Sequence, residues 1–443
     1  MSLSVPESRV LEIWQSPVRQ RVDLKTVSNE PVRIIYSGRP NDGRGADLKD
    51  AVIATPQGLI KGDIEFHTRS SGWWQHGHHE DPAYNSVILH IVREDDAGRE
   101  TRLQNGITVP TIALDKYTEE QPMRRLSSAF SPIPPVMCSS RPDILPALLD
   151  EAGVARFTAR TREFQEDILK EGAEQALYRG LMTALGYTKN KEAMAGLARA
   201  VPLKELEDVL NEAAADEVCL VQIQAYLLGA AALLPSQRFG NGTAGRPADE
   251  FEMELERRWV KSGRTAQMSA GEWQFFKVRP GNLPIRRIAA MGALLARYRK
   301  AGIRDGIMAS LEIDTEGSGR QLEDALMVKA DGYWEKYLDS GVPARGAVPA
   351  LLGRDRAGEI IINIALPFLA AYAREISMPE LETKALNIYH HYQAAAENSL
   401  EKHMRRQLGA PPGIVHNAQR QQGLLHLYKT LCTQGKCDIC LLH

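Results

Sequence analysis

The sequence predicts an α+β protein in which an N-terminal α/β domain precedes a mostly α-helical domain. The first ~130 residues consist of short runs in which polar and apolar side chains alternate, the period of a β-strand. A Pro- and Ser-rich stretch follows, after which the apolar period changes to that of an α-helix. We therefore assign residues 1–130 to the α/β domain, 131–145 to a linker or crossover, and 146–443 to the helical domain.

The N-terminal domain is expected to begin with a short helix over 7–15, where apolar residues share one face. Runs rich in β-branched residues predict strands over 32–38, 47–55, 59–69, 86–95 and 107–115. The turn sequence Pro56-Gln57-Gly58 predicts a hairpin between the second and third strands.

The helical domain is predicted from stretches of strong helix formers with helical spacing. These stretches are 160–186, 202–214, 284–302 and 384–408. Another apolar series runs from Ile360 to Tyr372, with a kink expected at Pro367.

Bulk composition narrows the class of protein. The net charge of -2 provides no overall basic field for nucleic acid, although local basic patches remain possible. The most apolar stretch, 219–234, contains two Gln and is interpreted as a buried helix, not a membrane span. Five Cys is an odd count and the N-terminus lacks a secretory pattern, so we expect a cytoplasmic protein without a disulfide framework.

The strand over 59–69 carries the main candidate site. Side chains alternate along a strand, so Asp63, Glu65 and His67 share one face. Asp47 opens the preceding strand, and paired carboxylates there would suit Mg²⁺ or Mn²⁺. Such an ion activates water and neutralises phosphate, and His67 would orient or deprotonate that water. A solvated sheet face would give the same alternation and remains the alternative.

Histidines gather beside this strand, five of the eleven lying between residues 67 and 90. His76, His78 and His79 are candidate metal ligands or supports for the Glu65 site. A helix would put His76 and His79 on one face and make His78 and His79 diverge. Ordinary surface histidines would produce the same pattern.

The C-terminal tail contains a C-x4-C-x2-C motif. Its cysteines are Cys432, Cys437 and Cys440. Closely spaced thiolates converge on one site, and Cys138 is the best fourth ligand for Zn²⁺ or an Fe–S cluster, with His426 or His443 as alternatives for zinc. The bound group would hold the tail to the domain junction. Incidental cysteines are the other interpretation.

Arginines in the helical half offer contacts to phosphate. They are Arg279, Arg287, Arg354 and Arg356. Salt bridges that hold the helical bundle to the first domain would explain them equally well.

The order helix, three strands, connecting segment, strand resembles the αβββαβ core of the PD-(D/E)xK nucleases, the restriction-endonuclease-like topology. The matching residues are Asp47 and Glu65-x-His67, and Glu12 would complete the site from the first helix. His67 stands where that family has Lys. The resemblance implies metal-dependent hydrolysis of nucleic acid. A degenerate module that binds nucleic acid or protein, and a metal hydrolase of a small substrate, are the alternatives.

Several longer motifs are similar to an uncharacterised bacterial family, domain of unknown function 2851. They are GDIEFH, GHHEDPAYN, RPGNLPIRRIA, GRDRAGEIIINIALPF and QQGLLHLYKTLCTQGKCDIC. The resemblance supplies no mechanism, but it implies that Cys138 and the tail cysteines belong to a family pattern.

Overall fold

The computed structural model describes most of the chain from Leu24 onwards. The described residues are 24–41, 43–115, 138, 141, 143–211, 216–240, 249–311, 318–346 and 348–442. The helix expected over 7–15, Glu12 and His443 lie outside them. The chain forms two compact units: residues 1–155, 397–416 and 420–443 form the first, and residues 156–396 and 417–419 the second.

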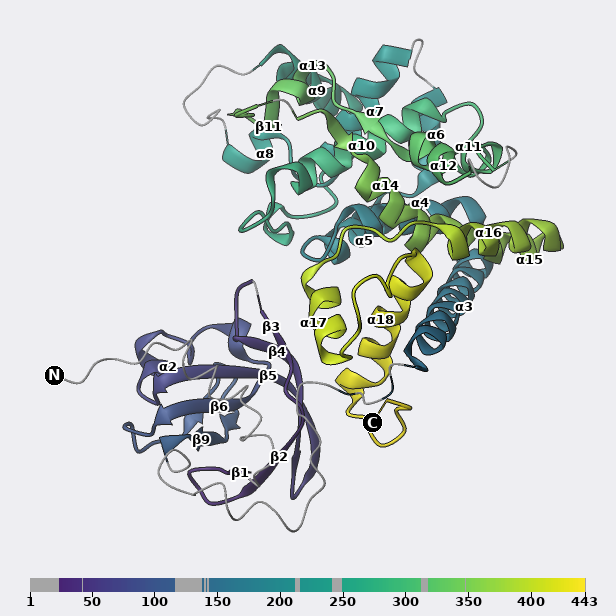
Figure 1. Ribbon diagram of the computed structural model, residues 1–443. Coiled ribbons are helices and arrows are strands. Elements are labelled where there is room, and N and C mark those ends of the chain that lie inside the picture. The colour runs from purple at the N-terminus through teal and green to yellow at the C-terminus, as the bar shows by residue number, and fades with distance from the viewer. Residues whose placement is uncertain are drawn as a thin grey trace. The chain divides into compact units, whose positions relative to one another are not determined.

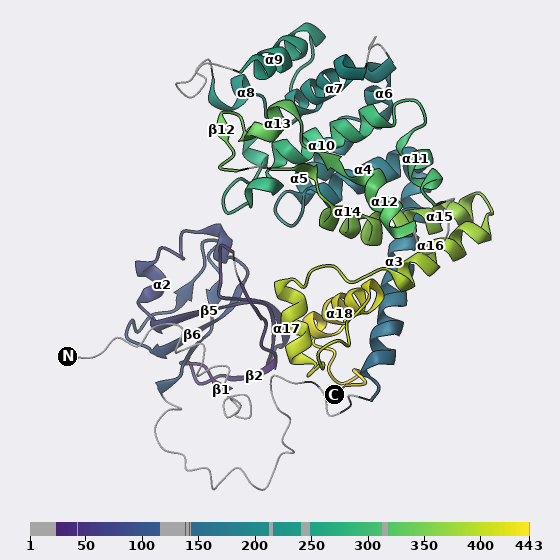
Figure 2. The same ribbon diagram turned by 45° about the horizontal axis from the view of Figure 1, so that its top comes forward.

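The first unit contains a mixed seven-stranded sheet, drawn in purple and blue in Figures 1 and 2. Its elements are β1 (Leu24–Lys25), β2 (Pro31–Tyr36), β3 (Arg39–Pro40), β4 (Leu48–Thr55), β5 (Gly58–Arg69), α2 (Gly72–Gln75), η2 (Pro82–Tyr84), β6 (Val87–Glu94), β7 (Thr101–Arg102), β8 (Thr108–Val109) and β9 (Thr111–Ala113). The main strand order is β1-β2-β4-β5-β6-β9, with β3 paired to β4 and a separate β7–β8 hairpin.

The predicted hairpin is present. β4 and β5 are antiparallel, and Thr55 pairs with Gly58 across a two-residue loop. Gly58 has φ 121°, a backbone angle that residues other than glycine rarely adopt. β6 then pairs parallel to β5, and β9 parallel to β6. Four of the five predicted strands are therefore confirmed with boundaries shifted by one or two residues, whereas 107–115 forms two short strands, β8 and β9, in different sheets.

The two faces of β5 differ as the alternation predicts. Ile64 and Phe66 are 0% and 1% exposed and join the apolar core on one side of the sheet. Asp63, Glu65 and His67 face the other way. All three are buried, at 5%, 6% and 1% exposure, so this is not a solvated sheet face.

The C-terminal segment belongs with the sheet, which differs from the single helical domain expected over 146–443. Its helices are α17 (Ser399–Gln407) and α18 (Ala418–Thr430), followed by η7 (Cys432–Gln434). Tyr36 and Val52 of the strands share an apolar cluster with Met404 and Leu427 of these helices. The helical stretch expected over 384–408 is interrupted before Asn398, whose side chain caps α17 by accepting a hydrogen bond from Glu401 N.

The second unit is mostly helical and has one continuous core. Its elements are α3 (Leu145–Glu171, which begins in the first unit), α4 (Ala173–Leu185), α5 (Lys191–Ala200), α6 (Leu203–Asn211), α7 (Asp216–Ala230), α8 (Pro235–Phe239), α9 (Glu250–Ser262), η4 (Ala270–Glu272), η5 (Pro280–Asn282), α10 (Pro284–Arg297), α11 (Ile303–Ala309), α12 (Ser318–Leu326), β10 (Val328–Lys329), α13 (Gly332–Lys336), β11 (Tyr337–Asp339), β12 (Val342–Pro343), β13 (Ala350–Leu352), α14 (Arg354–Ile360), η6 (Ile361–Ala365), α15 (Leu366–Glu375) and α16 (Pro379–His391). Pro367 lies in the first turn of α15, directly after the π-helical turn η6.

Two helical stretches of this unit are long and apolar enough to cross a membrane by length and composition. They are Val218–Phe239 and Arg354–Glu375, and 78% and 83% of their most apolar windows are buried inside the protein. Core helices of globular proteins pass the same test, so this is weak evidence for a membrane span.

Candidate functional site

Two carboxylates meet beside the β4–β5 hairpin. Asp47 directly precedes β4, and Glu65 lies on β5. Glu65 Oε2 accepts a hydrogen bond from Asp47 N at 3.0 Å, and Asp47 Oδ2 accepts one from Phe66 N at 3.1 Å. Each carboxylate is thus held by a main-chain N–H next to the other: Glu65 by the N–H of Asp47, and Asp47 by the N–H of Phe66. Glu65 is buried and Asp47 is exposed, so the pair extends from the interior to solvent.

Asp63 points its carboxylate at a different set of partners. It accepts hydrogen bonds from Lys49 Nζ at 2.6 Å, from Asp50 N at 3.2 Å and from the Ser86 hydroxyl. Asp50 has φ 62° in an irregular part of the β4–β5 pairing. The hydrogen bonds of Asp63 therefore stabilise the irregular part of the β4–β5 pairing and the start of β6. They fit a structural role better than the metal-ligand role predicted from sequence.

Three histidines converge next to Glu65. Ring nitrogens of His67, His76 and His78 lie within 4.8 Å of one another. We call these residues the histidine triad. His67 Nε2 and His76 Nδ1 are 3.2 Å apart, close to the ~3.3 Å between nitrogens bound to one tetrahedral Zn²⁺ at about 2.05 Å. His78 Nε2 lies 3.2 Å from Glu65 Oε1, which connects the triad to the carboxylates. Three imidazoles fit a transition-metal ion better than Mg²⁺.

A chain of hydrogen-bonded, buried side chains orients the triad through His67. His67 Nδ1 lies 2.9 Å from His90 Nε2, and His90 Nδ1 lies 2.8 Å from Thr101 Oγ1. Thr101 Oγ1 is in turn 3.0 Å from Thr111 Oγ1. If His67 Nδ1 donates along this chain, its Nε2 keeps a free lone pair toward the triad. Metal-bound histidines are usually oriented by such a second hydrogen bond.

Burial keeps the inner imidazoles neutral. Desolvation, and then the neighbouring His90, His78 and His76, lower the pKa of His67 to about 2. Desolvation, and then His78, lower the pKa of His90 to about 3. A neutral imidazole is the form that binds metal, and a neutral His67 supplies no permanent cation.

Two glycines create this arrangement. α2 ends at Gln75, and Gly77 has φ 74°, a left-handed conformation that breaks the helical spacing. His76 and His78 therefore converge on His67, whereas the predicted His76–His79 face does not form. His79 Nε2 instead lies 3.5 Å from Glu80 Oε1. Gly72 leaves room for the His67 ring, since a Cβ there would lie 2.6 Å from His67 Cδ2.

Aromatic rings cover the two buried histidines of the triad, His67 and His78, while His76 is exposed. Tyr84 stacks on His78 with ring centroids 3.8 Å apart, and Trp73 packs against the edges of His78 and His67. Burial, and then the charges of Glu65, Asp81 and Asp47, raise the pKa of Tyr84 to about 12. The Tyr84 hydroxyl therefore stays protonated at neutral pH.

Some members of this site were missed by sequence reasoning. Lys49, Tyr84, Thr101 and Thr111 were not singled out, and His90 was counted only as part of the histidine cluster. Lys49 follows Asp47 by two residues, a spacing that could have been noticed on the strand. The threonines are brought in by the β7–β8 hairpin and by β9, so no local pattern marks them.

The nucleic-acid role expected for two of the arginines does not fit the structure. Arg287 is 6% exposed and donates to Leu351 O at 2.6 Å and to Asn282 Oδ1 at 2.5 Å. Arg356 donates to Ala184 O and stacks over a tyrosine ring. These donors bind acceptors inside the helical unit, so the contacts are not the salt bridges to the first domain that the alternative proposed.

The other two arginines are nearer the surface. Arg354 pairs with Glu323 and Asp324, while Arg279 is exposed at the start of η5. The phosphate contact predicted for Arg279 and Arg354 remains a prediction.

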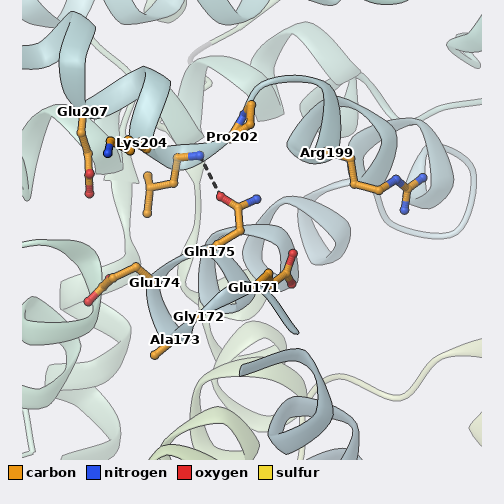
Figure 3. Close-up of a pocket in the computed structure, with 10 residues that line it drawn as sticks. Glu171, Gly172, Ala173, Glu174, Gln175, Arg199, Pro202, Lys204 and Glu207 are labelled. Carbon is orange, nitrogen blue, oxygen red and sulfur yellow. Dashed lines mark hydrogen bonds between the residues drawn. The ribbon is translucent and has the colours of Figure 1, made fainter. Parts of the chain in front are cut away.

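The helical unit also has a surface pocket of about 570 Å³, shown in Figure 3. Gln175 points across it and accepts a hydrogen bond from Leu203 N at 2.8 Å. Two of its carboxylates are already engaged, Glu171 with Arg179 and Glu174 with Arg304. The pocket does not offer the convergent ligands seen at the triad.

A family profile described as "Protein of unknown function (DUF2851)" matches residues 7–399. The chain belongs to this family. The match includes the hairpin, the triad and Cys138, but it ends before the tail cysteines, so membership in DUF2851 does not account for Cys432, Cys437 and Cys440. No curated protein and no solved structure matches the chain.

Proposed function

We propose that this protein is a metal-dependent hydrolase that cleaves phosphodiester bonds of nucleic acid. One observation carries the proposal: Asp47, Glu65 and the histidine triad converge at one side of the β4–β5 hairpin. This is a mixed carboxylate and imidazole set of the kind that holds hydrolytic metal ions.

The residues of the site divide into those that would bind a metal ion and one, Asp47, that would accept a proton. The histidine triad would hold a transition-metal ion such as Zn²⁺ or Mn²⁺, with Glu65 beside it. When bound, such an ion supplies charge neutralisation for a phosphate and a more acidic bound water. Asp47 is the exposed carboxylate of the set, so it is placed to accept a proton from an attacking water.

The strand order supports nucleic acid as the substrate. β2, β4 and β5 are successive antiparallel neighbours, and β6 returns parallel to β5. Asp47 precedes the second of these strands, and Glu65 lies on the third, as the resemblance to PD-(D/E)xK nucleases implies. The connection from β5 to β6 is short here, with α2 and η2 in place of a full crossover helix.

A specific observation favours a second candidate, hydrolysis of a small phosphate ester. Glu65, His67 and His78 are 6%, 1% and 7% exposed. A small substrate reaches such a buried centre more readily than a polymer does.

The test combines metal binding with cleavage. Calorimetric titration of Zn²⁺ and Mn²⁺ is followed by cleavage assays on single- and double-stranded DNA and RNA, with Mg²⁺ included. Glu65→Gln and His76→Ala should abolish cleavage, and His76→Ala should also weaken metal binding. His79→Ala is the matched control, since His79 is adjacent but outside the triad, and it should behave like the wild type.

The results of these assays distinguish the proposed function from the second candidate and from a contaminating nuclease. Equal cleavage by wild type, Glu65→Gln and His76→Ala would indicate a contaminant and overturn the proposal. Metal binding with turnover of bis(4-nitrophenyl) phosphate, but not of nucleic acid, would establish the second candidate instead.

A further inference from the structure

We propose that Cys138, Cys432, Cys437 and Cys440 bind an iron–sulfur cluster that fastens the C-terminal tail to the first unit. The proposal concerns a site separate from the histidine triad and does not depend on the proposed function. It starts from the folding of the tail, which places three thiols on two successive tight turns.

The tail folds into two tight turns, 432–435 and 437–440, and the first of them lies against the sheet. Gly435 N donates to Cys432 O at 3.1 Å, and Cys440 N donates to Cys437 O at 3.1 Å. Gly435 adopts φ 66°, and a Cβ at this position would lie 3.0 Å from Val52 Cγ1 of β4. Lys61 Nζ also donates to Gln434 Oε1 at 2.6 Å. The turn is thus seated against β4 and β5.

Cys138 reaches this turn from a distant part of the chain. Its N–H donates to Gln407 O at 2.7 Å, and Gln407 Nε2 lies 3.4 Å from Cys138 Sγ. Cys138, Cys432 and Cys440 pack against the same apolar cluster. The thiols of Cys138, Cys437 and Cys440 lie close enough to Cys432 to interact with it electrostatically.

The spacing favours a cluster over a single zinc ion. C-x4-C-x2-C with one remote Cys is the ligand spacing of plant-type [2Fe–2S] proteins, although here the remote Cys comes first. Sulfurs around one Zn²⁺ at about 2.3 Å would be ~3.8 Å apart. Among the described residues, the histidine triad is the set of three or more ligand atoms within 4.8 Å of one another, so the thiols are spread more widely. A cluster accepts this spread because its thiolates bind different irons.

The four thiols are free of disulfides and half-buried. Four half-buried thiols are suited to soft metal ions. The cluster would cross-link position 138 to the tail, on the opposite side of β4 from the core that contains Ile64 and Phe66. Its role is structural, and no electron transfer is required.

The test is anaerobic purification of the full chain, followed by assays of iron, acid-labile sulfide and zinc, with visible absorption and electron paramagnetic resonance after reduction. We expect iron and sulfide in equal amounts, and loss of at least nine-tenths of both in Cys437→Ser. Cys219→Ser is the matched control, because Cys219 is buried in α7 of the helical unit. It should keep its iron.

A variant that fails to fold would not decide the matter, so reconstitution provides a second measurement. Wild-type apoprotein treated with Fe²⁺ and sulfide should regain the spectrum and gain thermal stability. Zinc in place of iron would overturn the cluster. Absence of any metal, or equal iron in Cys437→Ser and wild type, would mean that the four cysteines are ordinary half-buried side chains.

Discussion

A single methyl group added at Gly72 should displace His67 and disrupt the histidine triad. Gly72 begins α2, and the His67 ring packs against it. A Cβ there would lie 2.6 Å from His67 Cδ2 and 3.0 Å from Cγ. Non-bonded carbons prefer a separation of about 3.5–4.0 Å, so the ring must retreat by about 1 Å.

The surroundings leave the ring little room to retreat. His67 lies 2.9 Å from His90 and 3.2 Å from His76, and it is 1% exposed. Overpacking of this kind costs about 1–3 kcal/mol, and alanine regains about 1 kcal/mol of helix propensity over glycine. We expect Gly72→Ala to lower the free energy of unfolding by up to about 2 kcal/mol. Misplacement of Nε2 should weaken metal binding about 10- to 100-fold.

The assay separates the steric effect from the metal effect. Urea unfolding in EDTA measures the first, and calorimetric titration with Zn²⁺ measures the second. Gly196→Ala in α5 is the control, because its Cβ would meet Met268 at an ordinary 3.6 Å. If Gly72→Ala is as stable as the wild type in EDTA and binds Zn²⁺ equally well, the packing described for His67 is wrong.

Three further predictions concern buried or half-buried side chains that affect the stability of the two units. Asp63→Asn should cost about 3 kcal/mol in urea unfolding, because Lys49 loses its buried partner, and it should leave Zn²⁺ affinity within a few-fold of wild type. Arg287→Met should cost about 2–4 kcal/mol by stripping buried acceptors of their donor, without affecting nucleic-acid binding. Burial lowers the pKa of His403 to about 4, and His403 Nε2 lies 2.7 Å from the Tyr36 hydroxyl. Because this folded pKa is below the unfolded value of about 6.5, stability from a neutral His403 is complete above pH 6.5 and is lost as pH falls toward 4, by at most about 3 kcal/mol. His403→Gln should flatten that part of the profile.

A result opposite to any of these three predictions would assign the residue a different role. If Asp63→Asn loses Zn²⁺ binding at unchanged stability, Asp63 is a metal ligand after all. Loss of nucleic-acid binding by a fully stable Arg287→Met protein would restore the phosphate-contact role. An unchanged pH profile in His403→Gln would assign the acid sensitivity to other groups, such as His67 and His90.

Local patterns in the sequence determined the central hairpin and the orientation of its side chains. Alternation has a period of two, so the faces of Ile64 and Glu65 follow from the strand assignment alone. The turn at Gly58 sets the register as far as Ala51 and Gly62, and a one-residue shift between Leu48 and Ala51 then places Asp47 beside Glu65. The face of Glu65 was therefore predictable from the sequence, whereas its alignment with Asp47 depends on this irregularity.

Long-range packing decided the rest of the histidine site. One left-handed residue, Gly77, selects His78 over His79 as the partner of His76, and sequence spacing does not encode that backbone angle. The support of His67 by His90 and Thr101 depends on parallel strand pairing and on a separate hairpin.

The arginines and the tail show the same limit at larger distances. Arg287 in an apolar helix suits phosphate or a buried carbonyl equally well, and only the packing of Leu351 beside it decides. The sequence marked the C-x4-C-x2-C tail as a ligand set, but its docking on β4, with Cys138 alongside, depends on apolar contacts between segments far apart in the chain. Local spacing specifies which side chains share a face, whereas burial and long-range contacts determine which faces meet.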